Sequence, residues 1–140
     1  MTRPADNAQS GRPRVAVIDD DPDQLEFYRL LLEPEGYVVD AFAGRDAALN
    51  AFAATPPDLI VTDLMMETLD AGFSFARTLR NDERLRAAPI ILVTAVGSQR
   101  GFDFAPRNAE ELQNMQVDAF LRKPIEPADL LHTIEDLLRR

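Results

Sequence analysis

The sequence predicts an α/β fold, with a doubly wound parallel sheet that helices cover on both faces. Three observations support this class. Five short segments are rich in apolar and β-branched residues, as buried strands are. They alternate with longer segments whose apolar residues recur every three or four positions, which is the pattern of amphipathic helices. Strands that alternate with helices form a parallel sheet, so we expect one domain of this kind.

The five predicted strands differ in how apolar they are. The first contains VAVI and runs straight into three aspartates, whereas the fourth, PIILVT, is almost entirely apolar and is expected near the centre of the sheet. The predicted strands span residues 14–18, 37–42, 58–62, 89–94 and 118–121. Five such strands without a glycine-rich dinucleotide loop favour the flavodoxin-like fold, with the strand order 2-1-3-4-5.

Five helices are expected to link and follow these strands. They span residues 22–33, 44–54, 71–81, 109–115 and 126–138. Asp21 and Pro22 are typical of the cap and the first position of a helix. The region of the fourth helix is irregular, because it holds two Gly, a Pro and two Phe, and the long loop Gly97–Asn108 precedes the only helical pattern there.

The composition is globular and excludes several classes of function. The 140 residues carry a formal net charge of −9, which disfavours non-specific binding to nucleic acid or to an anionic membrane. The chain has no Cys, and hence no disulfide or thiolate metal site. Because no apolar stretch could span a membrane and no signal peptide is evident, a cytoplasmic location is expected. Residues 1–12 are expected to form a flexible tail and residues 13–140 the folded domain.

Polar side chains are expected to gather where four of the strands end. They are Asp19, Asp20, Asp63, Thr94 and Lys123. In open parallel sheets, ligands bind at the carboxyl ends of the central strands. Three carboxylates form an all-oxygen site that suits Mg²⁺ better than Ca²⁺, with waters completing the shell. A carboxylate is suited to nucleophilic attack on phosphorus when it lies beside Mg²⁺, an ammonium group and a hydroxyl group. Asp63 stands alone at its strand end and is the candidate nucleophile.

Four motifs occur in order along the chain. They are VAVIDDDP, PDLIVTDLMM, PIILVTA and DAFLRKP. In this order and at these intervals they resemble the receiver domain of two-component response regulators, and the resemblance covers residues 14–140. It implies a phosphorylatable signalling domain rather than an enzyme. The implied partners are a sensor histidine kinase or a phosphotransfer protein, and an unknown downstream protein.

The resemblance also implies a role for each residue of the site. Asp63 would accept the phosphoryl group, and Lys123 would pair with that group. Asp20 and Asp63 would ligate Mg²⁺ directly, while Asp19 would do so mainly through water. The backbone carbonyl of Met65 would supply a further ligand.

Two residues would respond to phosphorylation according to this resemblance. Thr94 would swing toward the phosphoryl group, and Phe120 would follow it inward. Pro124 matches the position of a cis peptide bond in the family, which would aim Lys123 into the site. The face around the fourth helix and fifth strand would then change, and a homodimer is one assembly that this change could control.

Two departures from the family pattern and two alternatives remain. Glu67 stands where the family usually has Pro, in a loop that is one residue longer than usual. The stretch from Thr94 to Lys123 is also longer than usual, by about one to two helical turns.

One alternative function is that of a pseudo-receiver, a binding module without the phosphorylation. The other is a phosphatase of the haloacid-dehalogenase type, whose nucleophile motif resembles Asp19-x-Asp21, although its cap domain and late acidic motif are not found. Because no output domain follows the last helix, a stand-alone response regulator is expected.

Overall fold

The five predicted strands form one parallel sheet in the order that the sequence predicts. The computed structural model describes residues 12–63, 76–95 and 117–139, and the sheet lies within them. Its strands are β1 (Arg14–Ile18), β2 (Val38–Phe42), β3 (Leu59–Asp63), β4 (Ile90–Ala95) and β5 (Ala119–Lys123). They are ordered β2-β1-β3-β4-β5, and each neighbouring pair is parallel. The flavodoxin-like arrangement is therefore confirmed.

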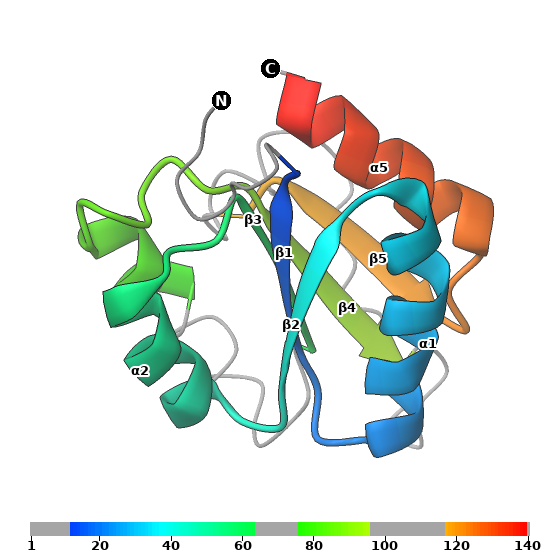
Figure 1. Ribbon diagram of the computed structural model, residues 1–140, viewed down its shortest axis with the longest axis horizontal. Helices are drawn as coiled ribbons and strands as arrows, with labels where there is room; N and C mark the ends of the chain where they lie inside the picture. The colour runs from blue at the N-terminus through cyan, green and yellow to red at the C-terminus, as the bar shows by residue number, and fades with distance from the viewer. Residues whose placement is uncertain (1–11, 64–75, 96–116, 140) are drawn as a thin grey trace.

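Helices cover both faces of this sheet (Figure 1). α1 (Pro22–Leu32) and α5 (Pro127–Arg139) lie against one face, and α2 (Arg45–Ala54) and the helical residues 76–81 lie against the other. The predicted fourth helix, the loop Gly97–Asn108 and the start of the predicted third helix lie outside the described residues. Within the part of the chain that the structure describes, no helix is long and apolar enough to cross a membrane.

The hydrophobic core has two halves, because successive residues of a strand point to opposite faces of the sheet. The buried residues on the side of α1 and α5 include Val17, Leu32, Val61, Val93 and Ile134. Those on the side of α2 include Ile18, Phe52, Ile60, Leu79 and Leu92. All five residues of β3 are buried, so the aspartate that ends this strand is held in a well-packed position.

The link between β1 and α1 positions two aspartates. Asp21 caps α1, as predicted: its carboxylate accepts a hydrogen bond from the Asp23 N–H at 3.0 Å, and Pro22 takes the first helical position. Asp19 and Asp20 lie between the last residue of the strand and this cap. A short, capped link of this kind leaves their side chains at the carboxyl edge of the sheet.

The turn after α1 is closed by a glycine. A 3₁₀ turn, η1 (Glu33–Glu35), follows α1, and Gly36 then adopts a φ of 98°, where other residues are strained. Arg12, which the sequence placed in the predicted tail, donates from Nε to Gly36 O at 3.2 Å. The remainder of the predicted tail, residues 1–11, lies outside the described residues.

Two aspartates tie neighbouring strands together at the amino end of the sheet. Asp58 precedes β3, and its Oδ2 accepts a bond from the Arg14 N–H at 2.7 Å while its own N–H donates to Arg14 O at 2.8 Å. Asp118 precedes β5 and makes the same two bonds with Ile90, both of 2.8 Å. The Arg80 guanidinium also pairs with the Asp118 carboxylate. Each aspartate thus fixes how two adjacent strands begin.

Asp118→Ala is expected to lower the free energy of unfolding by about 1–3 kcal/mol, because the Ile90 N–H loses its acceptor and the Arg80 guanidinium loses its carboxylate partner. Asp118→Asn should lower it less, since an amide oxygen can still accept the bond from Ile90. Urea denaturation followed by circular dichroism measures both values. Equal losses for the two variants would show that the Ile90 bond contributes nothing to stability.

Candidate metal centre

Three carboxylates meet at the carboxyl edge of the sheet, as the sequence predicts. Asp19 and Asp20 follow β1, and Asp63 ends β3, which is the neighbouring strand. One carboxylate oxygen from each of the three side chains lies within 4.8 Å of the other two. Among the described residues, no other group of three Asp, Glu or His side chains gathers in this way. This cluster is therefore the candidate metal centre.

The three carboxylates differ in their exposure. Asp19 is buried, with 1% of its surface exposed, and Asp63 is buried with 8%, whereas Asp20 is exposed to solvent. Asp19 Oδ1 accepts a hydrogen bond from the Asp21 N–H at 2.9 Å. Burial raises the pKa of the Asp19 carboxyl, and this outweighs the bonds from the Asp21 N–H and from Lys123, which lower it. An ionised Asp19 is therefore stabilised by any additional cation beside it.

Lys123 brings positive charge to this cluster from the far side of β4. It ends β5, and its Nζ donates to Asp19 Oδ2 at 2.9 Å and to Asp63 Oδ2 at 3.1 Å. Burial acts to lower the pKa of Lys123, but the hydrogen bond to Asp19 and the charge of Asp63 outweigh it, so the pKa is raised. The ammonium stays charged and joins the two buried carboxylates. The Lys123–Pro124 peptide bond is cis, as the resemblance implies.

The pKa of Lys123 can be measured directly, because it is the only lysine in the chain. In protein carrying ¹³C-labelled lysine, the single Cε signal is expected to titrate above the ordinary value of 10.5 when Mg²⁺ is absent. Because the pKa of Lys123 is raised by folding, the stability that this residue contributes is fully present at pH values below its pKa in the unfolded chain. That stability is lost as the pH rises through the pKa of Lys123 in the folded protein. In Asp63→Asn the signal should titrate lower than in the wild type. A wild-type pKa at or below 10.5 would contradict the pairing.

The donor set of the cluster fits a hard divalent cation. All three side chains offer oxygen ligands, and within the described part of the chain these three carboxylates outnumber the ammonium of Lys123. Because Asp20 is exposed, solvent reaches the cluster on that side, and waters can complete the octahedral shell that Mg²⁺ requires. The residues that could hold the ion are Asp19, Asp20 and Asp63.

Comparison with known proteins shows the family to which the chain belongs. The family model described as the response regulator receiver domain matches residues 15–135. The chain belongs to this family. A receiver domain is a signalling module rather than an enzyme, so the phosphatase of the haloacid-dehalogenase type has no support as an alternative.

Individual relatives show the same likeness to receiver domains. The chain is 34% identical over 136 residues to the DNA-binding dual master transcriptional regulator RpaA of Synechocystis. The aligned region covers 91% of this chain and 50% of RpaA. It spans about half the length of this and other curated relatives that it matches. The solved receiver domain of the Francisella response regulator 1452 is 28% identical, with a TM-score of 0.73 over 92% of this chain and 98% of that one. The solved signal receiver domain of a histidine kinase from Syntrophus aciditrophicus is 27% identical, with a TM-score of 0.74 over 91% and 90%.

The other predicted site residues are placed only in part. Thr94 is the second-last residue of β4 and lies in register with Arg122 of β5, while its side chain is outside what the structure describes. Phe120 of β5 is partly buried and packs against the core on the side of α2. Met65 and Glu67 lie outside the described residues. The cluster that the structure brings together is therefore the three aspartates and Lys123.

A buried tyrosine near the site was not singled out from the sequence. Tyr28 of α1 is 1% exposed, and its side chain is hydrogen-bonded to that of Gln24, one turn earlier. Burial raises the pKa of Tyr28 far above its ordinary value; the bond with Gln24 lowers it, and the charges of Asp19 and Asp63 raise it. The phenol therefore stays neutral within the electrostatic reach of the acidic cluster. A polar pair four residues apart, with one member on the buried face, is the signal that could have found it.

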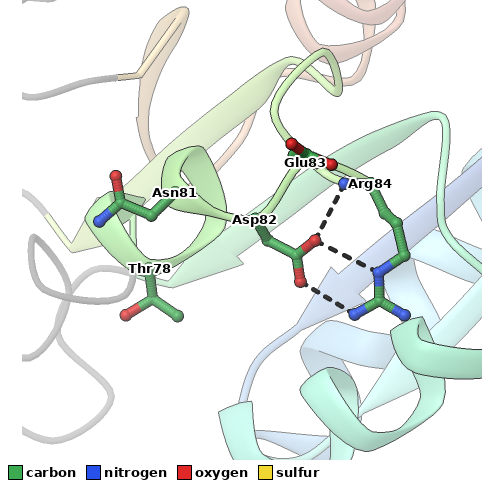
Figure 2. A pocket seen from close by; sticks show the side chains of 5 residues that line it. All are labelled: Thr78, Asn81, Asp82, Glu83 and Arg84. Atoms are coloured by element: carbon green, nitrogen blue, oxygen red, sulfur yellow. Dashed lines mark hydrogen bonds and ion pairs between the residues drawn. The ribbon is translucent and has the colours of Figure 1, made fainter.

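A polar hollow lies away from the acidic cluster, toward the amino end of the sheet. Figure 2 shows it at the end of the helical residues 76–81, lined by Thr78, Asn81, Asp82, Glu83 and Arg84. Arg84 Nη2 lies 2.9 Å from Asp82 Oδ2, and Arg84 Nη1 donates to Ala53 O of α2 at 3.1 Å. The segment then leads into the amino end of β4, whereas the acidic cluster lies at the carboxyl ends. The contacts of Arg84 join this segment to α2, and the hollow is separate from the acidic site.

Proposed function

We propose that this chain is a phosphoacceptor in a two-component system, in which Asp63 receives a phosphoryl group from a sensor histidine kinase or a phosphotransfer protein. The observation that carries the proposal is the position of Lys123, whose ammonium lies 3.1 Å from Asp63 Oδ2 beside two further carboxylates. Membership of the receiver family supports it. Residues 13–140 would form the unit that is phosphorylated.

Mg²⁺ would be held by the three aspartates of the cluster. Asp20 and Asp63 would be direct ligands, and the Met65 backbone carbonyl would add another. Asp19 would act mainly through water, which agrees with its two existing bonds, from a backbone N–H and from Lys123. When bound, Mg²⁺ would neutralise carboxylate charge and attract the oxygens of an incoming phosphoryl group.

Phosphoryl transfer would begin with attack of an Asp63 carboxylate oxygen on the phosphorus of the donor. An O–P bond forms at Asp63, and the N–P bond of a phosphohistidine breaks with its electron pair on the imidazole. With acetyl phosphate, the acyl O–P bond breaks instead and acetate leaves. Lys123 already contacts Asp63, and its ammonium would hold one oxygen of the transferred group. The product adds negative charge and acceptor oxygens at the buried end of β3.

Thr94 and Phe120 would convert this local change into an altered surface. Thr94 would turn toward the phosphoryl group, and Phe120 would move inward behind it. Phe120 is only partly buried against the core, so further burial would be favourable. The face around β5 would then present different contacts to a downstream protein, or to a second copy in a homodimer.

The test of this function is phosphate uptake with and without Mg²⁺. The full chain is incubated with acetyl phosphate, or with beryllofluoride as a mimic of the phosphoryl group, and bound acid-labile phosphate or beryllium is measured. We expect a single phosphoryl group per chain with Mg²⁺ and none with a chelator. If neither ligand is taken up in Mg²⁺, the chain behaves as a pseudo-receiver and the phosphoacceptor proposal fails.

Asp20→Asn is expected to weaken Mg²⁺ binding by roughly tenfold or more, since it removes the carboxylate that is open to solvent. Calorimetric titration with Mg²⁺ measures the affinity. Asp23→Asn is the matched control, because Asp23 is also exposed and acidic but stands outside the cluster. An unchanged affinity in Asp20→Asn would remove Asp20 from the ligand set.

A further inference from the structure

β2 is an edge strand, and part of its backbone faces away from the rest of the sheet. Among the strands that the structure describes, β2 pairs with β1 alone. The Val38 N–H points toward β1, where it donates to Pro13 O at 2.9 Å. Alternate residues of a parallel strand direct their N–H and C=O groups to opposite sides. Val39 and Ala41 therefore present these groups outward, where another strand can pair with them.

Arg29 of α1 covers one of these outward groups. Its Nη1 donates to Val39 O at 3.3 Å and lies 3.3 Å from Glu33 Oε2, one turn later in α1. A groove of about 310 Å³ follows the same edge. Its lining includes Arg29, Val39, Ala41, Phe42, Ala51 and Thr55. The β2 edge thus has open space beside it, while the Arg29 side chain is hydrogen-bonded to Val39 O, the acceptor that an added strand would need.

We propose that Arg29 keeps the β2 edge closed against a second copy of this chain. When Arg29 is removed, two β2 strands can pair antiparallel about a two-fold axis at Asp40, so that Val39 of one copy lies opposite Ala41 of the other. Such a pair of residues exchanges two backbone hydrogen bonds, and one of them uses Val39 O. Arg29 Nη1 donates to this oxygen in each copy, so the guanidinium stands where the N–H of the added strand would have to approach, and half of the bonds between the two copies use such an oxygen.

A second copy suits this edge because the pattern of outward groups is self-complementary. Val39 and Ala41 stand symmetrically on either side of Asp40, and a two-fold axis brings the same patch of both copies together. Asp40 would face its own counterpart, where like charges are unfavourable. Arg14 offsets that charge within each copy, through bonds of 3.0 and 2.8 Å to the Asp40 carboxylate. With the charge of Asp40 offset in each copy, removal of Arg29 is expected to be enough to allow pairing.

The test is the mass of Arg29→Ala in solution, measured by light scattering over a range of protein concentrations. The variant is expected to approach twice the mass of the wild type at the same concentration. Glu33→Gln and Arg84→Ala are matched controls that should keep the wild-type mass. Glu33→Gln leaves the bond from Arg29 to Val39 intact. Arg84→Ala removes an arginine that also joins a carboxylate and a backbone carbonyl, but outside the β2 edge.

A second substitution tests the geometry of the pairing. Ala41→Pro in the Arg29→Ala background removes an outward N–H that β1 does not use, so the fold is kept and the mass should return to that of the wild type. Circular dichroism checks that this chain is folded. Hydrogen exchange of the Val39 and Ala41 amides in Arg29→Ala gives an independent readout, because their protection should rise with concentration. The proposal would be overturned if Arg29→Ala kept the wild-type mass or assembled beyond a doubled mass. It would also be overturned if either control doubled its mass, or if the pair survived Ala41→Pro in a folded chain.

Discussion

Asp63→Asn is expected to take up no phosphate from acetyl phosphate and Mg²⁺, under conditions in which the wild type is phosphorylated. An amide is not a nucleophile toward phosphorus, and it also removes one negative ligand from the metal centre. The fold should be kept, because the amide oxygen can still accept the bond from Lys123. Acid-labile phosphate is measured on the intact chain, and circular dichroism confirms that the variant is folded.

The control for this loss is an aspartate that lies nearby but outside the cluster. Asp23→Asn changes an exposed carboxylate in the first turn of α1 and should be phosphorylated as the wild type is. Loss of uptake in both variants would mean that general negative charge, and not Asp63, governs the reaction. Undiminished uptake in Asp63→Asn would place the phosphoacceptor elsewhere.

Lys123→Ala is expected to lower the free energy of unfolding by about 2–3 kcal/mol in Mg²⁺-free buffer at neutral pH. The substitution removes the ammonium that contacts both Asp19 and Asp63, and leaves two buried carboxylates without it. The loss should be smaller than that for a fully buried pair, because the Lys123 side chain keeps 22% of its surface exposed. Urea denaturation in the presence of a chelator measures the change.

Measuring the stability of Lys123→Ala with and without Mg²⁺ is a more specific test of the role of Lys123. A cation bound at the cluster replaces the charge that Lys123 supplied, so added Mg²⁺ should stabilise Lys123→Ala more than it stabilises the wild type. Lys123→Arg keeps a positive charge at the same position and is the matched control, with a smaller loss of stability. If Lys123→Ala were as stable as the wild type without Mg²⁺, the contacts of Lys123 with the carboxylates would not contribute to folding.

The strands and the acidic cluster were predictable because both depend on local patterns. Each strand is a short apolar run, and helices that alternate with those runs predict a parallel sheet. The lack of a glycine-rich dinucleotide loop then favours the observed strand order. Asp19, Asp20 and Asp63 stand at the ends of two of the runs, and parallel strands bring such ends to one edge. The cap at Asp21 was also a local signal, set by the proline that follows it.

The contacts of individual side chains were not predictable in the same way. Lys123 contacts Asp19 and Asp63, whereas Asp20, which follows Asp19 in the chain, is exposed. Which carboxylates Lys123 contacts depends on how its side chain extends past β4. Asp58 and Asp118 bond to strands that are distant in sequence, so no periodicity reveals them. Such contacts are set by the packed fold and not by the local pattern. The roles given to Thr94, Phe120 and Met65 stay predictions.

The most direct test of the phosphoacceptor role is the position of the phosphoryl group after reaction with acetyl phosphate and Mg²⁺. Borohydride reduces an aspartyl phosphate to homoserine, and mass spectrometry of the digested chain then identifies the residue that was modified. We expect homoserine at position 63 alone, and none when Mg²⁺ is chelated. Homoserine at position 19, or at no position in a chain that binds Mg²⁺, would contradict the role proposed for Asp63.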